Sequence, residues 1–165
     1  MGMVTGRARR LGAIALALVA LAAGCGEGKE AAKEESGAPE SAEGGLTAFE
    51  LENGIGPVKE AITLSAIDKA MAAGGKGVFE AKCTACHKMD TLYVGPALGE
   101  VTTRRTGAFI MNMILNPQEM VERHPVAKQL LAERMTFMAN QNLTLEEARA
   151  VLEYLRTQSK TTPKP

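Results

Sequence analysis

Hydrophobic residues recur at helical spacing through most of the second half of the chain. The clearest case is 144–158, where one apolar stripe contains Leu145, Ala148, Val151, Leu152 and Leu155. Thr144 and Glu147 stand three residues apart, the spacing of a capping box. We therefore expect a helix from Thr144 to Gln158.

Other segments carry weaker helical signals. Apolar residues at turn spacing predict a helix from Ser65, as N-cap, to Cys83, with Gly74-Gly75 as a point of weakness. A second helix is expected from Thr106 to Leu115, where Asn116-Pro117 stops it. Shorter helices are expected at 117–122, with Asn116 as cap, and at 126–133. Strand-like alternation is not evident, so the pattern predicts an all-α fold.

The N-terminus has the pattern of an export signal. Three arginines and no acid precede an apolar run from Leu11 to Ala23, which is too short to span a bilayer permanently. The run ends Leu21-Ala22-Ala23-Gly24-Cys25, which resembles a bacterial lipobox with Cys25 as the lipidated residue. The alternative is an ordinary signal peptide cut near Ala23 or Gly24, leaving a free thiol.

Composition divides the rest of the chain. Residues 25–45 are rich in Gly, Glu, Ala and Ser and contain too little apolar surface to fold, so they are interpreted as a flexible tether. The predicted divisions are a signal peptide at 1–24, the tether at 25–45, a folded domain at 46–158 and a disordered tail at 159–165. Loss of the signal leaves 16 basic against 19 acidic residues, and the folded domain is near neutral, so nothing points to nucleic acid as a partner.

The folded domain contains one chemically specific motif. Cys83-Thr84-Ala85-Cys86-His87 reads C-x-x-C-H, the attachment site of a c-type haem. The two thiols can form thioethers with the haem vinyl groups, and the adjacent His supplies an axial iron ligand. A thioredoxin-like motif would follow a strand in a βαβ pattern, and a zinc site would need about four ligands. Neither context is found, so we expect one covalently bound haem.

The order of several short motifs resembles class I monohaem cytochromes c, over roughly residues 75–156. Gly75 and Phe79 precede Cys83 by eight and four residues, and 152–155 matches the apolar and aromatic face of the family's last helix. In the family these positions place the helix before the haem motif, its first, against the last helix, so the resemblance implies the same packing here. Gly95-Pro96-Ala97-Leu98 resembles the family's G-P-x-L loop. The resemblance implies a cytochrome c fold in which the Pro96 carbonyl accepts a hydrogen bond from the ring of His87 and orients it.

The same resemblance indicates which residue is the second axial ligand of the iron, opposite His87. The segment from Met138 to Thr144 is similar to the family's M-P-x-x-x-L-S/T segment, with Ala139 in place of the usual Pro. Met138 is thus the first candidate, and Met135 is the second. His124 would give a bis-His haem, but a His before Pro at a helix break is expected on the surface. Arg104-Arg105 either pair with haem propionates or form a solvated pair in a loop.

These features together predict a lipid-anchored, single-electron carrier of the bacterial cell envelope, on the periplasmic or extracytoplasmic side. With both axial positions filled, no substrate reaches the iron, so it is expected to be a carrier of electrons between redox proteins and not an enzyme. Residues 101–117 and 140–144 are similar to small cytochromes associated with bacterial nitrous oxide reduction, which implies a copper-containing reductase as acceptor. The alternatives are a haem module that binds a gas, and a fixed subunit of a larger respiratory complex.

Overall fold

A computed structural model of the chain describes residues 41–42 and 45–160. The predicted signal peptide, the lipidation site Cys25, most of the tether and the last five residues lie outside this part. None of the helices within it is both long and apolar enough to cross a bilayer. Ser159 and Lys160, which the sequence assigned to the tail, hydrogen-bond to the Glu100 carboxylate (2.9 and 3.1 Å).

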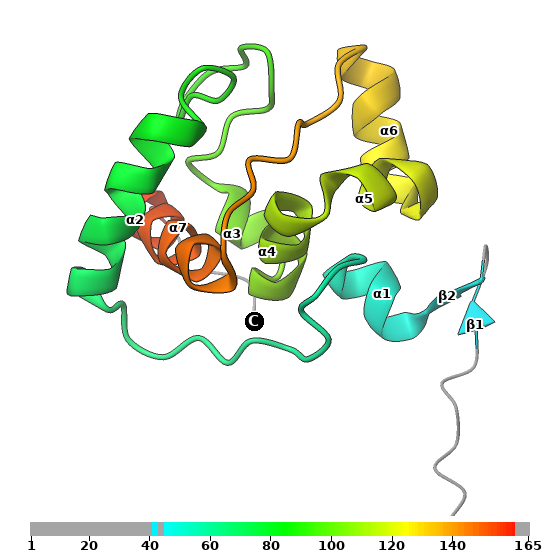
Figure 1. Cartoon of the computed structure of the whole chain (residues 1–165), viewed down its shortest axis with the longest axis horizontal. Helices are drawn as coiled ribbons and strands as arrows, with labels where there is room; N and C mark the ends of the chain where they lie inside the picture. The colour runs from blue at the N-terminus through cyan, green and yellow to red at the C-terminus, as the bar shows by residue number, and fades with distance from the viewer. Residues whose placement is uncertain (1–40, 43–44, 161–165) are drawn as a thin grey trace, which may run out of the picture. The chain divides into compact units, whose positions relative to one another are not determined.

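The described residues form helices and one very small sheet, which confirms the all-α prediction (Figure 1). The sheet is a two-residue antiparallel pair, in which Ala42 pairs with Leu46. The elements in chain order are β1 (Ser41–Ala42), β2 (Leu46–Thr47), α1 (Ala48–Asn53), α2 (Lys69–Lys82), α3 (Val101–Arg104), α4 (Gly107–Leu115), α5 (Pro117–Arg123), α6 (Pro125–Arg134) and α7 (Leu145–Gln158).

Helices α2 and α7 pack directly against each other, and α4 packs on α7 (Figure 1). The α2–α7 crossing is close because Gly75 lies against the Ala150 carbonyl, where a side chain would collide. The rings of Phe79 and Tyr154 meet beside it, 5.3 Å apart. The packing that the resemblance predicted for the first and last helices is therefore present.

The remaining N-terminal residues extend this arrangement. Residues 46–58, here called the N-terminal clasp, lie against α4 and α5 through a second apolar cluster that includes Leu46, Ile55, Phe109 and Met120. The buried Asn112 side chain of α4 holds the clasp by three hydrogen bonds. Its amide donates to the Asn53 and Val58 carbonyls (3.0 Å each), and its oxygen accepts from the Val58 N–H (2.9 Å). The sequence predicted neither α1 nor this attachment.

Two local predictions were wrong, and one was right only in part. Helix α2 begins at Lys69 and not near Ser65, because Asp68 caps it by accepting from the Met71 N–H, and Gly74-Gly75 does not divide it. Asn116 is the N-cap residue of α5, but its side chain makes no capping hydrogen bond, since its amide donates to the Ile55 carbonyl and the Glu119 carboxylate. His124 is fully buried and not on the surface. The N-caps Thr106 and Thr144, with the capping box of α7, are confirmed.

Candidate functional site

The C-x-x-C-H motif continues the last turn of α2. The Cys83 N–H donates to the Phe79 carbonyl, and the N–H groups of Cys86 and His87 both donate to the Cys83 carbonyl (3.1 and 2.9 Å). This turn places both thiols and the imidazole on the wall of one cavity. Since α2 is fixed against α7, the three groups are carried by a rigid element.

That cavity has a volume of about 450 Å³ and a largely apolar lining. Its walls come from the end of α2, the loop at 94–98, α4, the inner face of α6, residues 136–141 and α7. A volume of several hundred cubic ångströms with a few convergent polar groups is typical of a cofactor site. Two thiols at haem-attachment spacing, an imidazole and this apolar enclosure fit a haem.

The loop after the motif fixes the His87 ring. His87 Nδ1 lies 3.0 Å from the Pro96 carbonyl oxygen. A carbonyl can only accept, so Nδ1 donates and the lone pair of the neutral ring is left on Nε2. The predicted hydrogen bond between His87 and Pro96 is therefore present, and it leaves Nε2 as the nitrogen that can coordinate iron.

Gly95 is required beside this ring for steric reasons. A Cβ at this position would overlap the His87 imidazole. The Gly95 N–H also donates to the Cys86 carbonyl (2.8 Å), which ties the loop to the motif. The main chain of Gly95 and Pro96 therefore lies directly against His87.

The chemistry of the cysteines argues against the other readings of the motif. Cys83 and Cys86 are not joined in a disulfide. Burial raises the pKa of the Cys83 thiol, and the neighbouring Cys86 raises it further by a smaller amount. A redox-active C-x-x-C motif needs the opposite shift, toward a thiolate. Within the described residues, no three His, Cys, Asp or Glu side chains lie together where they could hold a metal ion.

The two candidate methionines differ in their surroundings. Met138 lines the cavity and packs against the main apolar cluster. Met135 ends α6 in a left-handed conformation (φ 54°), and 85% of its surface is exposed. His124 does not line the cavity. Of the three candidate ligands, Met138 is the one that lines the cavity.

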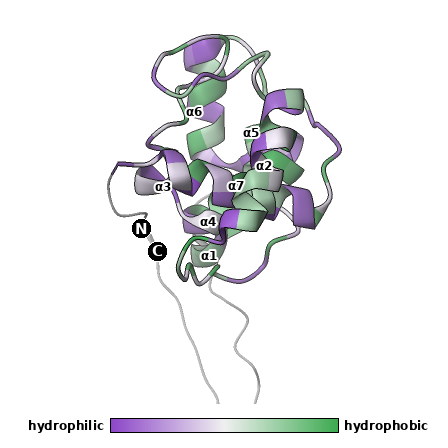
Figure 2. Ribbon diagram, turned by 90° about the vertical axis from the view of Figure 1, so that its left-hand side faces the viewer, coloured by the Kyte–Doolittle hydropathy of each residue, from purple (hydrophilic) through white to green (hydrophobic). Residues whose placement is uncertain are grey.

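Helix α6 supplies a wall that the sequence interpretation did not assign to the site. Ala127, Leu130, Leu131 and Arg134 face the cavity. Figure 2 shows hydrophobic and hydrophilic residues alternating along α6, and the four residues named are buried or half-buried while residues 128, 129, 132 and 133 are exposed. The inner residues recur every three or four positions in the sequence, which is helical spacing. That spacing does not indicate which cavity they line.

Both arginines of the predicted pair lie at the cavity and each has a partner. The Arg104 guanidinium donates to the Ala97 carbonyl (3.0 Å), and the Arg105 guanidinium lies 5.1 Å from the centre of the Phe109 ring. They are therefore not simply a solvated pair in a loop.

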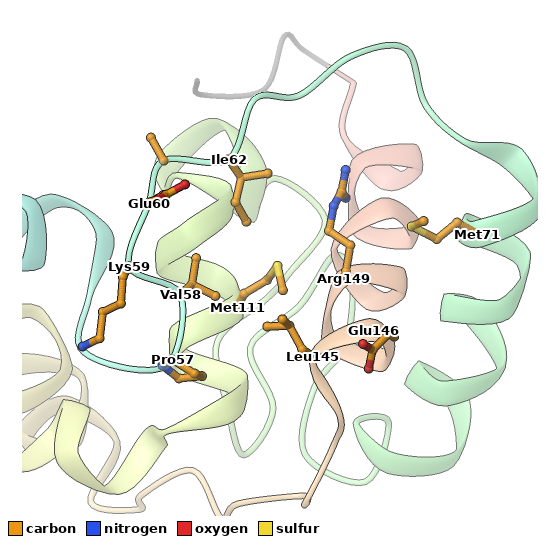
Figure 3. Close-up of a pocket in the computed structure, with 11 residues that line it drawn as sticks. Pro57, Val58, Lys59, Glu60, Ile62, Met71, Met111, Leu145, Glu146 and Arg149 are labelled. Carbon is orange, nitrogen blue, oxygen red and sulfur yellow. The ribbon is translucent and has the colours of Figure 1, made fainter.

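A second hollow lies between residues 57–62 and α7 (Figure 3). Its volume is about 630 Å³, of the same order as that of the first cavity. Val58, Ile62, Met111 and Leu145 form its apolar part, with Lys59 and Glu146 among its charged residues. It contains neither Cys nor His, so chemistry and not volume identifies the first cavity as the functional site.

Comparison with known proteins agrees with this geometry. A family model described as Cytochrome c matches residues 72–159. Cytochrome c-551 of Stutzerimonas stutzeri is 46% identical over 43 residues, 26% of this chain and 41% of that protein, so the match covers less than half of the curated relative.

Solved structures match over a longer part. Cytochrome c from Rhodothermus marinus is similar at a TM-score of 0.63 and 49% sequence identity, covering 66% of this chain and 94% of that one. An engineered form of the same cytochrome, solved with a bound carbene intermediate, is similar at a TM-score of 0.60 and 49% identity, covering 66% and 95%.

Proposed function

The chain belongs to the cytochrome c family, and from that premise we propose that it carries single electrons between redox proteins outside the cytoplasm. Haem c, which members of this family bind covalently, supplies the one-electron change between ferric and ferrous iron. Cys83 and Cys86 are the attachment residues. This function is that of a carrier and not of an enzyme.

The observation that carries the proposal is the convergence of two chain segments on one apolar cavity. The turn after α2 brings Cys83, Cys86 and His87, and residues 136–143, here called the distal segment, bring Met138. We assign His87 and Met138 as the axial ligands. A thioether favours ferrous iron and raises the reduction potential, as electron carriers of this kind require.

The protein's own residues prepare this site. The Pro96 carbonyl holds the Nδ1 proton of His87, which fixes the ring and increases the donor strength of Nε2. Apolar side chains of α4 and α6 exclude water from the cavity, which disfavours the extra charge of ferric iron. Arg104 and Arg105 line the cavity, as do Lys82 and Arg134, and we assign the first two as partners of the haem propionates.

The visible spectrum of the purified holoprotein tests this proposal. We expect low-spin bands in both redox states, a weak sulfur-to-iron band when oxidised, and no reaction of the reduced form with carbon monoxide. High-spin iron or prompt carbon monoxide binding would instead indicate an open site, and the gas-binding alternative would replace the carrier.

Two matched variants test the sixth ligand. Met138→Ala is expected to abolish the sulfur-to-iron band and admit carbon monoxide, because it removes the thioether that lines the cavity. Met135→Ala removes an exposed side chain and should leave both properties unchanged. The reverse result would transfer the assignment to Met135.

A lipid on Cys25 is the proposed anchor, and the tether would let the domain reach a donor and an acceptor on one membrane at raised effective concentration. The support is the resemblance of 21–25 to a lipobox. Cys25→Ser is expected to move the protein from the membrane to the soluble fraction while the haem spectrum stays unchanged. An unchanged membrane fraction would exclude the lipid.

The acceptor proposed from the narrower resemblance is a copper-containing nitrous oxide reductase. The support is the similarity of residues 101–117 and 140–144 to small cytochromes associated with that reduction. Stopped-flow mixing of the reduced protein with such a reductase should show reoxidation that saturates with reductase concentration. Absence of reoxidation would exclude this acceptor while leaving the carrier function intact.

A further inference from the structure

His124 occupies a position that the function described so far does not explain. It is fully buried, yet it lies outside the haem cavity. It stands between α5 and α6, where its N–H donates to the Met120 carbonyl (2.8 Å) and its carbonyl accepts from the Lys128 N–H (3.0 Å). Buried polar side chains nearly always have hydrogen-bond partners. The partners of the His124 ring therefore indicate its role.

Both nitrogens of the ring are engaged. Nδ1 accepts from the Val126 N–H (3.2 Å) and so caps α6, while Nε2 lies 3.2 Å from the Leu51 carbonyl and donates to it. The ring also packs edge-on against Phe109, with centroids 5.3 Å apart. One side chain therefore joins the N-terminal clasp, α4 and the start of α6.

His124 caps α6, which forms one wall of the haem cavity. In the chain, α6 is followed by the distal segment. Leu130, Leu131 and Arg134 of α6 line the cavity, and α6 ends at Arg134, four residues before Met138. We propose that His124 is a positioning residue, which holds α6 in place in its neutral form and thereby keeps the distal segment closed over the haem. This inference rests on the ligand assignment proposed above.

The surroundings of the ring favour its neutral form. The carbonyls of Glu50 and Leu51 in α1 face the His124 ring, and so does the apolar ring of Phe109 in α4. The Arg105 cation lies near the Phe109 ring. Burial, aided by Arg105, holds the pKa of His124 below its ordinary 6.5, and the two carbonyls oppose this shift only in part.

Acidification therefore has a defined direction of effect. An opened state takes up a proton at about pH 6.5, whereas the closed state resists protonation to lower pH. The contribution of His124 is complete above pH 6.5 and is lost as the pH falls below it. A protonated Nδ1 can no longer accept from Val126, so the cap of α6 is the contact that fails.

The test compares two variants of His124 with a control in the holoprotein. His124→Ala removes all three ring contacts, and His124→Asn retains an N-cap oxygen but cannot reach Leu51. Asp68→Ala removes the N-cap of α2, on an element that carries no part of the distal segment. Global stability is measured by denaturant unfolding, and opening of the site by the rate at which reduced haem binds carbon monoxide.

We expect His124→Ala to raise the rate of carbon monoxide binding at pH 7 about fivefold or more, the factor that one lost cap carries. His124→Asn should give a smaller increase, and Asp68→Ala should lower stability without opening the site. In the unmodified protein the sulfur-to-iron band should weaken between pH 7 and 5, and His124→Asn should flatten this pH dependence.

Two results would overturn the inference: equal opening in His124→Ala and Asp68→Ala, or an unchanged pH profile in His124→Asn. If His124→Ala does not fold, the comparison of the pH profiles of the unmodified protein and His124→Asn decides. A missing sulfur-to-iron band in the unmodified protein at pH 7 would mark a failure of the ligand assignment itself, and this inference would fall with it.

Discussion

At the residue scale, the site depends on a position without a side chain. Gly95 brings main chain against the His87 ring, where any Cβ would overlap the imidazole, and the next residue supplies the carbonyl that holds Nδ1. The orientation of the ligand is therefore set by two adjacent backbone positions. Residues that never touch iron can consequently control its coordination.

We predict that Gly95→Ala will displace the His87 ring and weaken its hydrogen bond to Pro96, because the methyl group needs the space that the ring occupies. The expected result is a higher reduction potential, because the weaker hydrogen bond lowers the donor strength of Nε2 toward ferric iron, or partial high-spin iron, measured by spectroelectrochemistry.

Gly77→Ala is the matched control for that substitution. A Cβ there meets no atom within 4 Å, and the position lies within α2. It should leave the potential unchanged and stabilise the fold slightly, by about 0.5–1 kcal/mol. Equal potentials for the two variants would show that Gly95 does not set the ring orientation.

At the element scale, the α2–α7 crossing is the support on which the haem motif is mounted. Gly75 allows the two backbones to approach, and Phe79 and Tyr154 pack at the side of the contact. A buried ion pair strengthens α7, in which the Glu153 carboxylate accepts twice from the Arg156 guanidinium (2.8 and 2.7 Å). Arg156 also donates to the Ser65 carbonyl, which fixes the chain before α2.

The neighbouring glycines of α2 provide a sharp test of this crossing. Gly75→Ala should destabilise the protein by about 1–3 kcal/mol or more, because a methyl group would collide with the Ala150 carbonyl. Gly74→Ala, one position away, meets open space and should stabilise it by about 0.5–1 kcal/mol. Thermal unfolding of both variants measures the difference, and shifts of the same sign would contradict the packing described.

At the scale of the whole described domain, the N-terminal clasp adds a second apolar cluster to a haem-binding unit. It lies outside residues 72–159, the part that matches the family model. The clasp contacts α4 and α5 through Asn112 and Met120, and α6 through His124. It therefore braces the side of the domain that carries the distal segment.

Asn112→Ala is expected to loosen the clasp. It leaves the Val58 N–H and the carbonyls of Asn53 and Val58 without this partner, at about 1–3 kcal/mol for each group that stays buried and unsatisfied. Hydrogen exchange should increase across 46–58. If exchange there equals that of the unmodified protein, the side chain does not hold the clasp.

Acid should loosen the clasp side of the domain before the α2–α7 side. Burial lowers the pKa of His124, and hydrogen bonds from Thr47 and Asn116 lower those of Glu50 and Glu119, so all three contribute stability that is lost on acidification. The His124 contribution fades below pH 6.5, and those of the two carboxylates fade below 4.5.

Hydrogen exchange at pH 7 and pH 5, corrected for intrinsic rates, should therefore show α5 and α6 losing protection while α2 and α7 retain it. A uniform loss across all four helices would contradict this order.

The sequence by itself determined the features that depend on residues close together in the chain. The C-x-x-C-H spacing and the caps Thr106 and Thr144 are local, because each involves bonds or turns within a few residues. The role of Pro96 beside His87 was implied by the resemblance of 95–98 to the G-P-x-L loop of the family. The helical content followed from apolar spacing for the same reason. The identity of the cofactor and the proximal side of the site were consequently predictable.

Only the tertiary structure decided what depends on distant segments. His124 is buried because α1 and α4 close over it. The Asn116 amide joins the clasp to Glu119 of α5 and does not make a capping bond to the helix backbone. Asp68 is the N-cap of α2, and the Ser65 carbonyl accepts from Arg156. Periodicity reports which face of a helix is apolar, but not which neighbour covers that face. Long-range packing therefore determined the wall formed by α6 and the role we propose for His124.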